Sequence, residues 1–382
     1  MSVVHFLAAL SLAFLWACGP KPLVPSSPLD TPAFHYSQGV ACLERGDLSG
    51  AQAEIARAEA LDRGYPGVAV ARALLAMEQG DFHRAQQQIE TALHRDDDFV
   101  DAHIAWGRVL TRRARAERRQ GDGWLEEASR AFREALRRDP QSAPAHYYQG
   151  MACLQALRFA EGREALARVI ALNRGDWVAR AMAELERVQA VERAAPGSRT
   201  GMEIGLSERI TRAELGVLLI EEMRLPELVA KRGLPERAAP FRPPASPDPP
   251  VAPEPSDLQG CWARPWVEQV LSLRVAGLET FPDGTFQPDS TLTRASYALV
   301  NQGLLVLLTG DPSLATRYVG QESAFADVRS DFYAYNAIAL SAERGIMHAD
   351  RRSGRFRPAD PVSGAEALLM IRELQNAFRM EF

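Results

Sequence analysis

A 34-residue repeat is the feature that most constrains how this chain folds. Small residues between positions 39 and 58 recur 34 positions later, and the turn pair Gly46-Asp47 recurs as Gly80-Asp81. The recurring small residues are Gly39, Ala51 and Ala58 in the first copy and Ala73, Ala85 and Ala92 in the second. Small residues let two helices approach closely, and larger apolar residues fill the space between successive pairs. The pattern predicts stacked helical hairpins, of which at least three are needed to bury a common core.

Two further copies follow the first pair. The third separates its small residues, Gly107 and Ala128, by nine positions more than the first copy does, which predicts an insertion between its two helices. The fourth begins near Gly150, and residues 177–193 predict a capping helix. This order resembles the tetratricopeptide repeat (TPR) family, which implies an all-α helical solenoid over residues 33–194.

The TPR resemblance also implies a binding function. In this family the first helix of each hairpin lines a concave groove that binds a peptide or another protein. By family position, the groove candidates are Tyr36, Val40, Val70, Leu74, Ile104, Arg108, Tyr147 and Met151. The alternative is that some of these side chains belong to the core or to the solvated surface. The sequence does not identify the partner.

The N-terminus predicts export. The apolar run at residues 6–14 is shorter than the roughly 20 residues that span a bilayer, and it suits the central part of a secretory signal. The following segment, Leu15-Trp16-Ala17-Cys18, resembles a lipobox, which implies removal of residues 1–17 and diacylation of Cys18. Two acyl chains would hold the protein on a membrane, and the proline-rich residues 18–32 predict an extended tether. The alternative is a buried N-terminal helix.

A second proline-rich segment, residues 236–256, separates the C-terminal region into two parts. No helix or central strand accommodates so many prolines, so this segment predicts a stiff spacer. Related patterns lie on both sides of it. Each pattern ends in a helix that begins with threonine or serine followed by arginine or glycine: Thr211-Arg212, Thr293-Arg294 and Ser363-Gly364.

Loops with turn signals precede the last two of these helices. Phe281-Pro282-Asp283-Gly284 is a turn in which proline presets φ and glycine accepts a positive φ, and Gly354 has the corresponding place downstream. The order of helix, loop and second helix resembles the S-layer homology (SLH) motif. The matching segments are a partial copy at residues 198–235 and fuller copies at residues 257–309 and 322–378.

The SLH resemblance implies a pseudo-threefold helical bundle that binds anionic, often pyruvylated, cell-wall polysaccharide or a peptidoglycan-linked polymer. Chemistry supports the same residues. A helix N-terminus presents N–H groups and a partial positive charge, and an arginine beside the cap adds a fork-shaped donor for a carboxylate. The polysaccharide-binding candidates are therefore Thr211, Arg212, Thr293 and Arg294. The third copy has Gly364 in place of arginine, which leaves its site open to question.

Capping boxes are predicted where a hydroxyl residue precedes a glutamate by three positions, as in Thr211 with Glu214 and Ser363 with Glu366. In the second copy Ser296 replaces the glutamate. The alternative for all three helix starts is that the hydroxyl residues are caps, the arginines are solvated and no ligand binds.

Other classes of function find little support. The net charge of -5 argues against a nucleic-acid partner, and no catalytic motif or histidine pair at metal-ligand spacing is present. We therefore expect no enzyme activity, no metal and no cofactor. The sequence predicts a lipid-anchored protein of the cell envelope, outside the cytoplasm, and on the periplasmic face of the outer membrane if the organism has two membranes. The alternatives are an assembly scaffold whose SLH motifs are only structural, and a wall-active enzyme.

Overall fold

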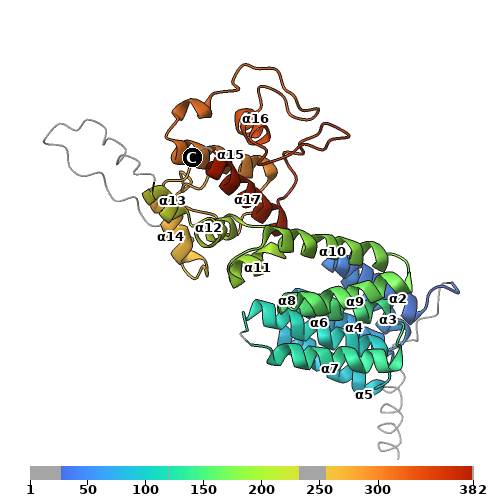
Figure 1. The fold of residues 1–382 in the computed structure, drawn as a ribbon. Coiled ribbons are helices and arrows are strands. Elements are labelled where there is room, and N and C mark those ends of the chain that lie inside the picture. Colours follow the sequence, from blue (N-terminus) through green and yellow to red (C-terminus); the bar gives the residue numbers. More distant parts are fainter. Residues whose placement is uncertain (1–26, 120, 232–254, 381–382) are drawn as a thin grey trace, which may run out of the picture. The chain divides into compact units, whose positions relative to one another are not determined.

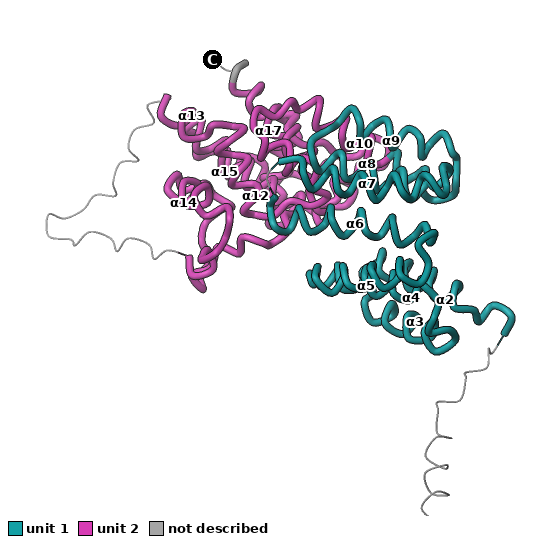
Figure 2. Tube along the Cα trace, turned by 90° about the horizontal axis from the view of Figure 1, so that it is seen from below, with its two compact units in different colours: residues 1–182 teal, residues 183–382 magenta. Residues whose placement is uncertain are grey.

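The protein folds into two compact helical units. A computed structural model describes residues 27–119, 121–231 and 255–380. It is 64% helical, without a β-strand in the described residues. Unit 1 comprises residues 1–182 and unit 2 residues 183–382 (Figure 2). The predicted fold class, an all-α solenoid followed by a helical bundle with short loops, is confirmed.

Unit 1 is a row of antiparallel helix pairs (Figure 1). The pairs are α2 (Pro32–Glu44) with α3 (Leu48–Leu61), α4 (Pro66–Glu78) with α5 (Phe82–Arg95), α6 (Val100–Ala116) with α7 (Gly123–Arg138), and α8 (Ala143–Gln155) with α9 (Phe159–Leu172). Helix α10 (Trp177–Ala194) follows, and the division between the units falls within it.

The repeated Gly-Asp pair forms the turn inside the first two hairpins. Gly46 and Gly80 have φ values of 78° and 79°, a region that favours glycine. The aspartate after each glycine caps the next helix. Asp47 accepts a hydrogen bond from the main-chain N–H of Gly50, and Asp81 accepts one from that of Arg84. A local sequence signal therefore fixes where each second helix begins.

Small residues bring the paired helices together, as predicted. Ala51, Ala85 and Ala128 are fully buried. At Gly107 a Cβ atom would lie 2.4 Å from the ring of Phe132, so α6 and α7 meet at van der Waals contact. The predicted insertion is partly helical rather than confined to a loop, because α6 has 17 residues where α2 has 13.

Unit 2 contains two helices from each of the three motifs, and contacts between successive motifs join them in a ring. The pairs are α11 (Arg199–Gly205) with α12 (Arg212–Glu221), α14 (Arg264–Ser272) with α15 (Arg294–Thr309), and α16 (Tyr335–Glu343) with α17 (Gly364–Met380). Helix α13 (Leu225–Lys231) and the 3-10 helix η1 (Pro312–Ala315) lie in the connections. The second helix of each pair packs on the first helix of the next, since α12 contacts α14, α15 contacts α16, and α17 contacts α11.

A closed ring of backbone hydrogen bonds joins the three pairs. The residue two positions before each second helix donates to its counterpart in another pair: Leu292 N–H to Ile210 C=O, Val362 N–H to Leu292 C=O, and Ile210 N–H to Val362 C=O, at 2.9–3.0 Å. All three side chains are buried. The first copy lacks a long loop between its helices, yet it completes this threefold arrangement.

Two sequence predictions fall outside the described residues. Cys18 with the signal segment is one, and most of the proline-rich spacer is the other. Among the described helices, none combines the length and apolar character needed to cross a bilayer.

Candidate binding sites

Three interfaces in unit 2 hold the predicted polysaccharide-binding residues. The first interface lies between the start of α12 and the loop of residues 273–292. The second lies between the start of α15 and the loop of residues 344–362. The third lies between the start of α17 and residues 204–207. The predicted residues are thus placed one motif against the loop of the next.

Arg212 is buried at the first interface. Its Nε, Nη1 and Nη2 atoms donate to the carbonyl oxygens of Phe286, Gly277 and Glu279, at 2.9, 3.0 and 2.9 Å. The guanidinium carbon lies 4.8 Å from the ring centroids of both Phe281 and Phe286, and the residue is 8% exposed. Burial lowers the pKa of Arg212, and the carboxylates of two acidic residues nearby oppose that shift. An arginine nevertheless stays charged at this depth.

Arg294 has the equivalent place at the second interface but has a different set of partners. Its Nε and Nη2 atoms donate to the carbonyl oxygens of Phe356 and His348, both at 2.8 Å. Its Nη1 atom forms an ion pair with the carboxylate of Glu366. Burial raises the pKa of Glu366, and the Arg294 guanidinium opposes that shift.

The helix starts are more fully bonded than the sequence suggested. Thr211 and Glu214 form the predicted capping box, and the Thr293 side chain accepts from the N–H of Ser296 at 3.2 Å. The expected free N–H groups are absent from the starts of α12 and α15, because carbonyls of the next loop accept them. For example, the N–H of Arg212 donates to the C=O of Ser290 at 3.0 Å. Any ligand must therefore be held by side chains at these two positions.

Two aspartates that sequence analysis passed over hold the loops in place. Asp257 accepts from the main-chain N–H groups of Phe286 and Gln287, at 2.8 and 2.6 Å. Asp327, 70 positions later, accepts from the equivalent pair of N–H groups at 2.7 and 2.8 Å. The 70-residue spacing between these two aspartates was the available signal.

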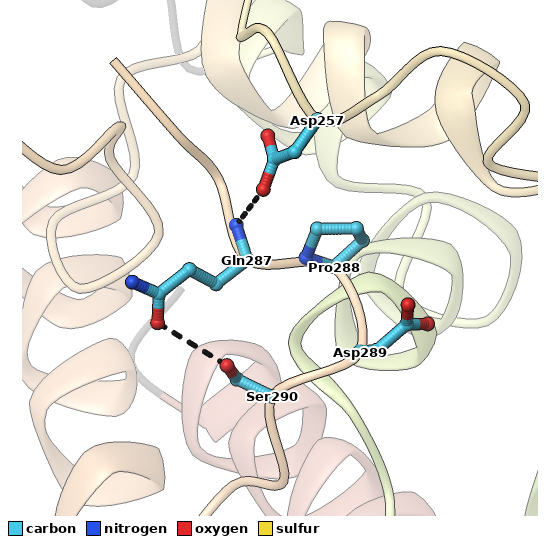
Figure 3. Close-up of a pocket in the computed structure, with 5 residues that line it drawn as sticks. All are labelled: Asp257, Gln287, Pro288, Asp289 and Ser290. Atoms are coloured by element: carbon cyan, nitrogen blue, oxygen red, sulfur yellow. Dashed lines mark hydrogen bonds between the residues drawn. The ribbon is translucent and has the colours of Figure 1, made fainter. Parts of the chain in front are cut away.

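An open pocket of about 390 Å³ lies beside the first loop (Figure 3). It is lined by Asp257, Gln287, Pro288, Asp289 and Ser290. Its two charged side chains are carboxylates, and one of them is bonded to the loop backbone. This pocket is therefore a poor receptor for an anion.

The third interface has no room for a side chain. The N–H of Gly364 donates to the C=O of Ser207 at 2.9 Å. A Cβ atom at Gly364 would lie 1.7 Å from the carbonyl oxygen of Ile204. Glycine replaces arginine here because α11 and its C-terminal turn occupy the space that the longer loops leave open.

The predicted TPR groove residues fall into two sets. Leu74, Val70 and Ile104 are 1–4% exposed and belong to the core, so they cannot contact a partner in this conformation. The other candidates, Tyr36, Val40, Arg108, Tyr147 and Met151, are half-buried.

The half-buried set makes contacts between distant helices. Tyr36 donates its hydroxyl to Asp101 at 2.9 Å. The Arg108 guanidinium lies 4.2 Å from the ring centroid of Tyr148. Burial raises the pKa of Tyr36 well above its ordinary value and also raises the pKa of Asp101.

Glu44, which sequence analysis also passed over, links the first helices of two hairpins, α2 and α8, and helix α10. It accepts from the Tyr148 hydroxyl at 3.3 Å and pairs with Arg180 at 2.7 Å. These contacts join the end of α2 to α8 and to the start of α10, across 104 and 136 positions of sequence. The inner surface of the array is thus occupied in part by its own side chains.

Neither the buried Cys153 thiol nor an acidic cluster in the described residues forms a further site. Burial raises the pKa of Cys153 to about 11, which disfavours a reactive thiolate. Within the part of the chain that the structure describes, no group of three or more potential ligands is placed to hold a metal ion.

Comparison with known protein families finds a match within each unit. The tetratricopeptide repeat matches residues 70–113 and 111–176, and the S-layer homology domain matches residues 278–298 and 324–368. The chain therefore contains TPR repeats and an SLH domain. Both are non-catalytic interaction domains, which suggest protein–protein interaction, cell-wall binding and a cell-surface or envelope location.

Solved structures similar to this chain include two bacterial proteins. One is TTC0263, a thermophilic TPR protein of Thermus thermophilus, with 19% identity, a TM-score of 0.36, and coverage of 52% of this chain and 96% of that chain. The other is pilF of Pseudomonas aeruginosa, with 19% identity, a TM-score of 0.30, and coverage of 53% and 85%. None of the curated proteins compared matches this chain.

Proposed function

We propose that this chain is a lipid-anchored envelope protein that binds a cell-wall polymer through unit 2 and protein partners through unit 1. The wall-binding half of this proposal rests on the burial of Arg212 and on the partners of its guanidinium. This residue is only 8% exposed, yet no carboxylate among the described residues forms an ion pair with its guanidinium. A buried charge without an ion-pair partner is costly, so an anion that reaches it gains more than it would at a solvated arginine.

The geometry at Arg212 leaves donors for such an anion. A guanidinium has five N–H groups, and three of those of Arg212 are used by carbonyl oxygens. Two remain, one on each terminal nitrogen. Phe281, which lies against the guanidinium, is 38% exposed and offers an apolar face to a sugar ring. A sugar that carries a carboxylate meets both requirements.

The proposed membrane anchor depends on Cys18. The apolar run before it and the proline-rich segment after it favour an acylated cysteine on an extended tether. The envelope location suggested by the SLH domain agrees with export of the chain.

For unit 1 we propose that the half-buried groove residues Tyr36, Arg108, Tyr147 and Met151 contact the protein partner. Leu74 is left out because it is buried. The aromatic and guanidinium groups of this set are those that most often dominate protein interfaces.

Binding to wall sacculi tests the proposal. We expect the full chain to sediment with purified sacculi, and the double variant Arg212→Ala/Arg294→Ala to bind at least tenfold more weakly, since a charge-assisted hydrogen bond contributes about 1.5–3 kcal/mol. The matched control is Arg209→Ala/Arg351→Ala, which removes the same charge from two exposed positions. Equal, poor sedimentation of wild type and double variant would refute wall binding.

A second candidate function has its own support. Arg212 and Arg294 each bind carbonyl oxygens of the next motif, so they also act as clamps within the bundle. This favours a scaffold in which the SLH motifs are structural and the TPR array is the working part. In that case the double variant would lose stability while wild type shows no affinity for sacculi.

A further inference from the structure

The three interfaces of unit 2 differ in the charge that faces each helix start. The first residue of the second helix is Arg212, Arg294 or Gly364 in the three motifs. The third residue of the same helices is Glu214, Ser296 or Glu366. At the second interface, the first residue of one helix contacts the third residue of the helix in the next motif, Arg294 with Glu366. By the order of the motifs, the equivalent of Glu366 at the first interface is Ser296.

At the second interface this pairing neutralises the arginine. Glu366, the third residue of α17, directs its carboxylate to the Arg294 guanidinium. Its main-chain N–H donates to the Ser363 side chain at 3.2 Å, so half of the predicted capping box is present. The other half is replaced by the ion pair. The Arg294 side chain is 13% exposed and already has an anion beside it.

At the first interface the equivalent glutamate is missing. Ser296, the third residue of α15, has a hydroxyl that lies 3.0 Å from the hydroxyl of Thr293. The two carboxylates that influence Arg212 from a distance, Asp257 and Glu279, each accept main-chain N–H groups instead. The positive charge of Arg212 therefore has no ion-pair partner in the described residues.

The loops strengthen this difference. The main-chain N–H of Phe281 donates to the C=O of Thr285, and its C=O accepts from the turn between them. In the third motif the main chain of Asp350 makes the equivalent two bonds with Arg355 and the turn before it. The first interface thus has the exposed ring of Phe281 at this backbone position, whereas the second has Asp350, whose carboxylate accepts hydrogen bonds from its own turn. At the third interface the Ile204 carbonyl fills the space where an arginine would lie.

We propose that unit 2 has one working anion site, at Arg212 with Phe281, and that the residue at positions 296 and 366 decides which interface is open. The ligand is a sugar that carries a carboxylate, held by the guanidinium and by the ring face of Phe281. Glu366 is an internal counter-ion that closes the second interface. This inference rests on the proposed wall-binding function and narrows it from two arginines to one.

Exchange of the two side chains tests the inference without removing either arginine. The probe is a hexosamine glycoside that carries a pyruvate ketal, titrated by calorimetry into the full chain and into Ser296→Glu, Glu366→Ser and the double exchange. We expect one site in wild type, at least a tenfold loss of affinity in Ser296→Glu, two sites in Glu366→Ser, and a single site in the double exchange. The same glycoside without the ketal is the control and binds to none of them.

The outcomes separate this inference from the wall-binding proposal. If wild type binds two probe molecules, or if Ser296→Glu binds as wild type does, the function stands and the single-site inference is wrong. If wild type binds neither the probe nor sacculi, both are wrong. Arg212→Gln adds a further readout: loss of the site in a variant with an unchanged circular dichroism spectrum supports the assignment. Loss in Arg294→Gln alone overturns it.

Discussion

Gly364 shows how one residue decides whether an interface can hold a ligand. Its Cβ position lies 1.7 Å from a backbone oxygen, and backbone cannot move aside as a side chain can. We expect Gly364→Ala to destabilise unit 2 by about 1–3 kcal/mol or more, as overpacking does elsewhere. Urea unfolding of the full chain measures this cost.

A glycine in the same unit provides the control. At Gly216, within α12, the nearest atoms to a Cβ would be 3.8 Å away, an ordinary contact distance. Gly216→Ala should therefore stabilise the unit by up to about 1 kcal/mol, because alanine favours a helix over glycine. Equal effects of the two substitutions would show that α11 does not pack on Gly364 as described.

Asp101 makes the stability of unit 1 depend on pH. Burial raises the pKa of Asp101 above its unfolded value, so the folded state binds its proton more tightly than the unfolded state does. Wild type should therefore lose stability as pH rises from the unfolded value through the raised value. Asp101→Asn does not titrate and still accepts from Tyr36. The stability of the variant relative to wild type should increase between about pH 4 and pH 7.

Glu134 makes the stability of unit 1 depend on pH in the opposite direction. Hydrogen bonds from Arg138 and Arg137 lower the pKa of Glu134, so wild type gains stability as pH rises from that lowered value through the unfolded value of about 4.3. Glu134→Gln should therefore fall in stability relative to wild type as pH rises through this acidic range, and should show no further change above about pH 5.5. Urea unfolding at several pH values measures both trends, and parallel curves for the two variants would contradict the account.

The binding residues show what local sequence can and cannot predict. The Thr-Arg pairs at helix starts were recognisable from sequence, because caps and turns are local. Their partners were not, because the carbonyls that bind Arg212 lie 65–74 positions away. The same holds for the ion pair between Arg294 and Glu366, 72 positions apart. Sequence identified these side chains but not which one keeps an unpaired charge.

At the scale of helix pairs, equivalent repeat positions differ in how closely they pack. A Cβ atom at Gly107 would lie 2.4 Å from the ring of Phe132, whereas at Gly39 the nearest atoms would be 3.5 Å away. We expect Gly107→Ala to destabilise unit 1 by about 1–3 kcal/mol, and Gly39→Ala to stabilise it by up to about 1 kcal/mol. Thermal unfolding of both variants tests this, and a shift of the same sign in both would contradict it.

The helices themselves were largely predictable. The 34-residue period located the hairpins, since small residues and Gly-Asp turns act over a few positions. Two features were not predictable on that basis. Part of the insertion in the third repeat lengthens α6. In the first SLH copy, the short helix α11 replaces the full first half of the motif. Both depend on packing with other helices rather than on local pattern.

For the whole molecule, the two interaction units and the predicted anchor give a consistent account. TPR repeats and an SLH domain in one envelope protein suit a chain that holds a partner near the wall. The three motifs of unit 2 close a ring, so the partial first copy is needed to complete the bundle even though the interface formed by its own α11 holds no arginine.

Bridging of a membrane to the wall tests the central claim most directly. Dye-filled lipid vesicles that carry the acylated full chain are mixed with purified sacculi and centrifuged at low speed, so that vesicles sediment only when attached. We predict sedimentation with wild type and its loss both in Cys18→Ser, which has no anchor, and in Ser296→Glu, which closes the Arg212 site. Vesicles that stay in the supernatant with wild type, or that sediment equally with Ser296→Glu, would contradict the account.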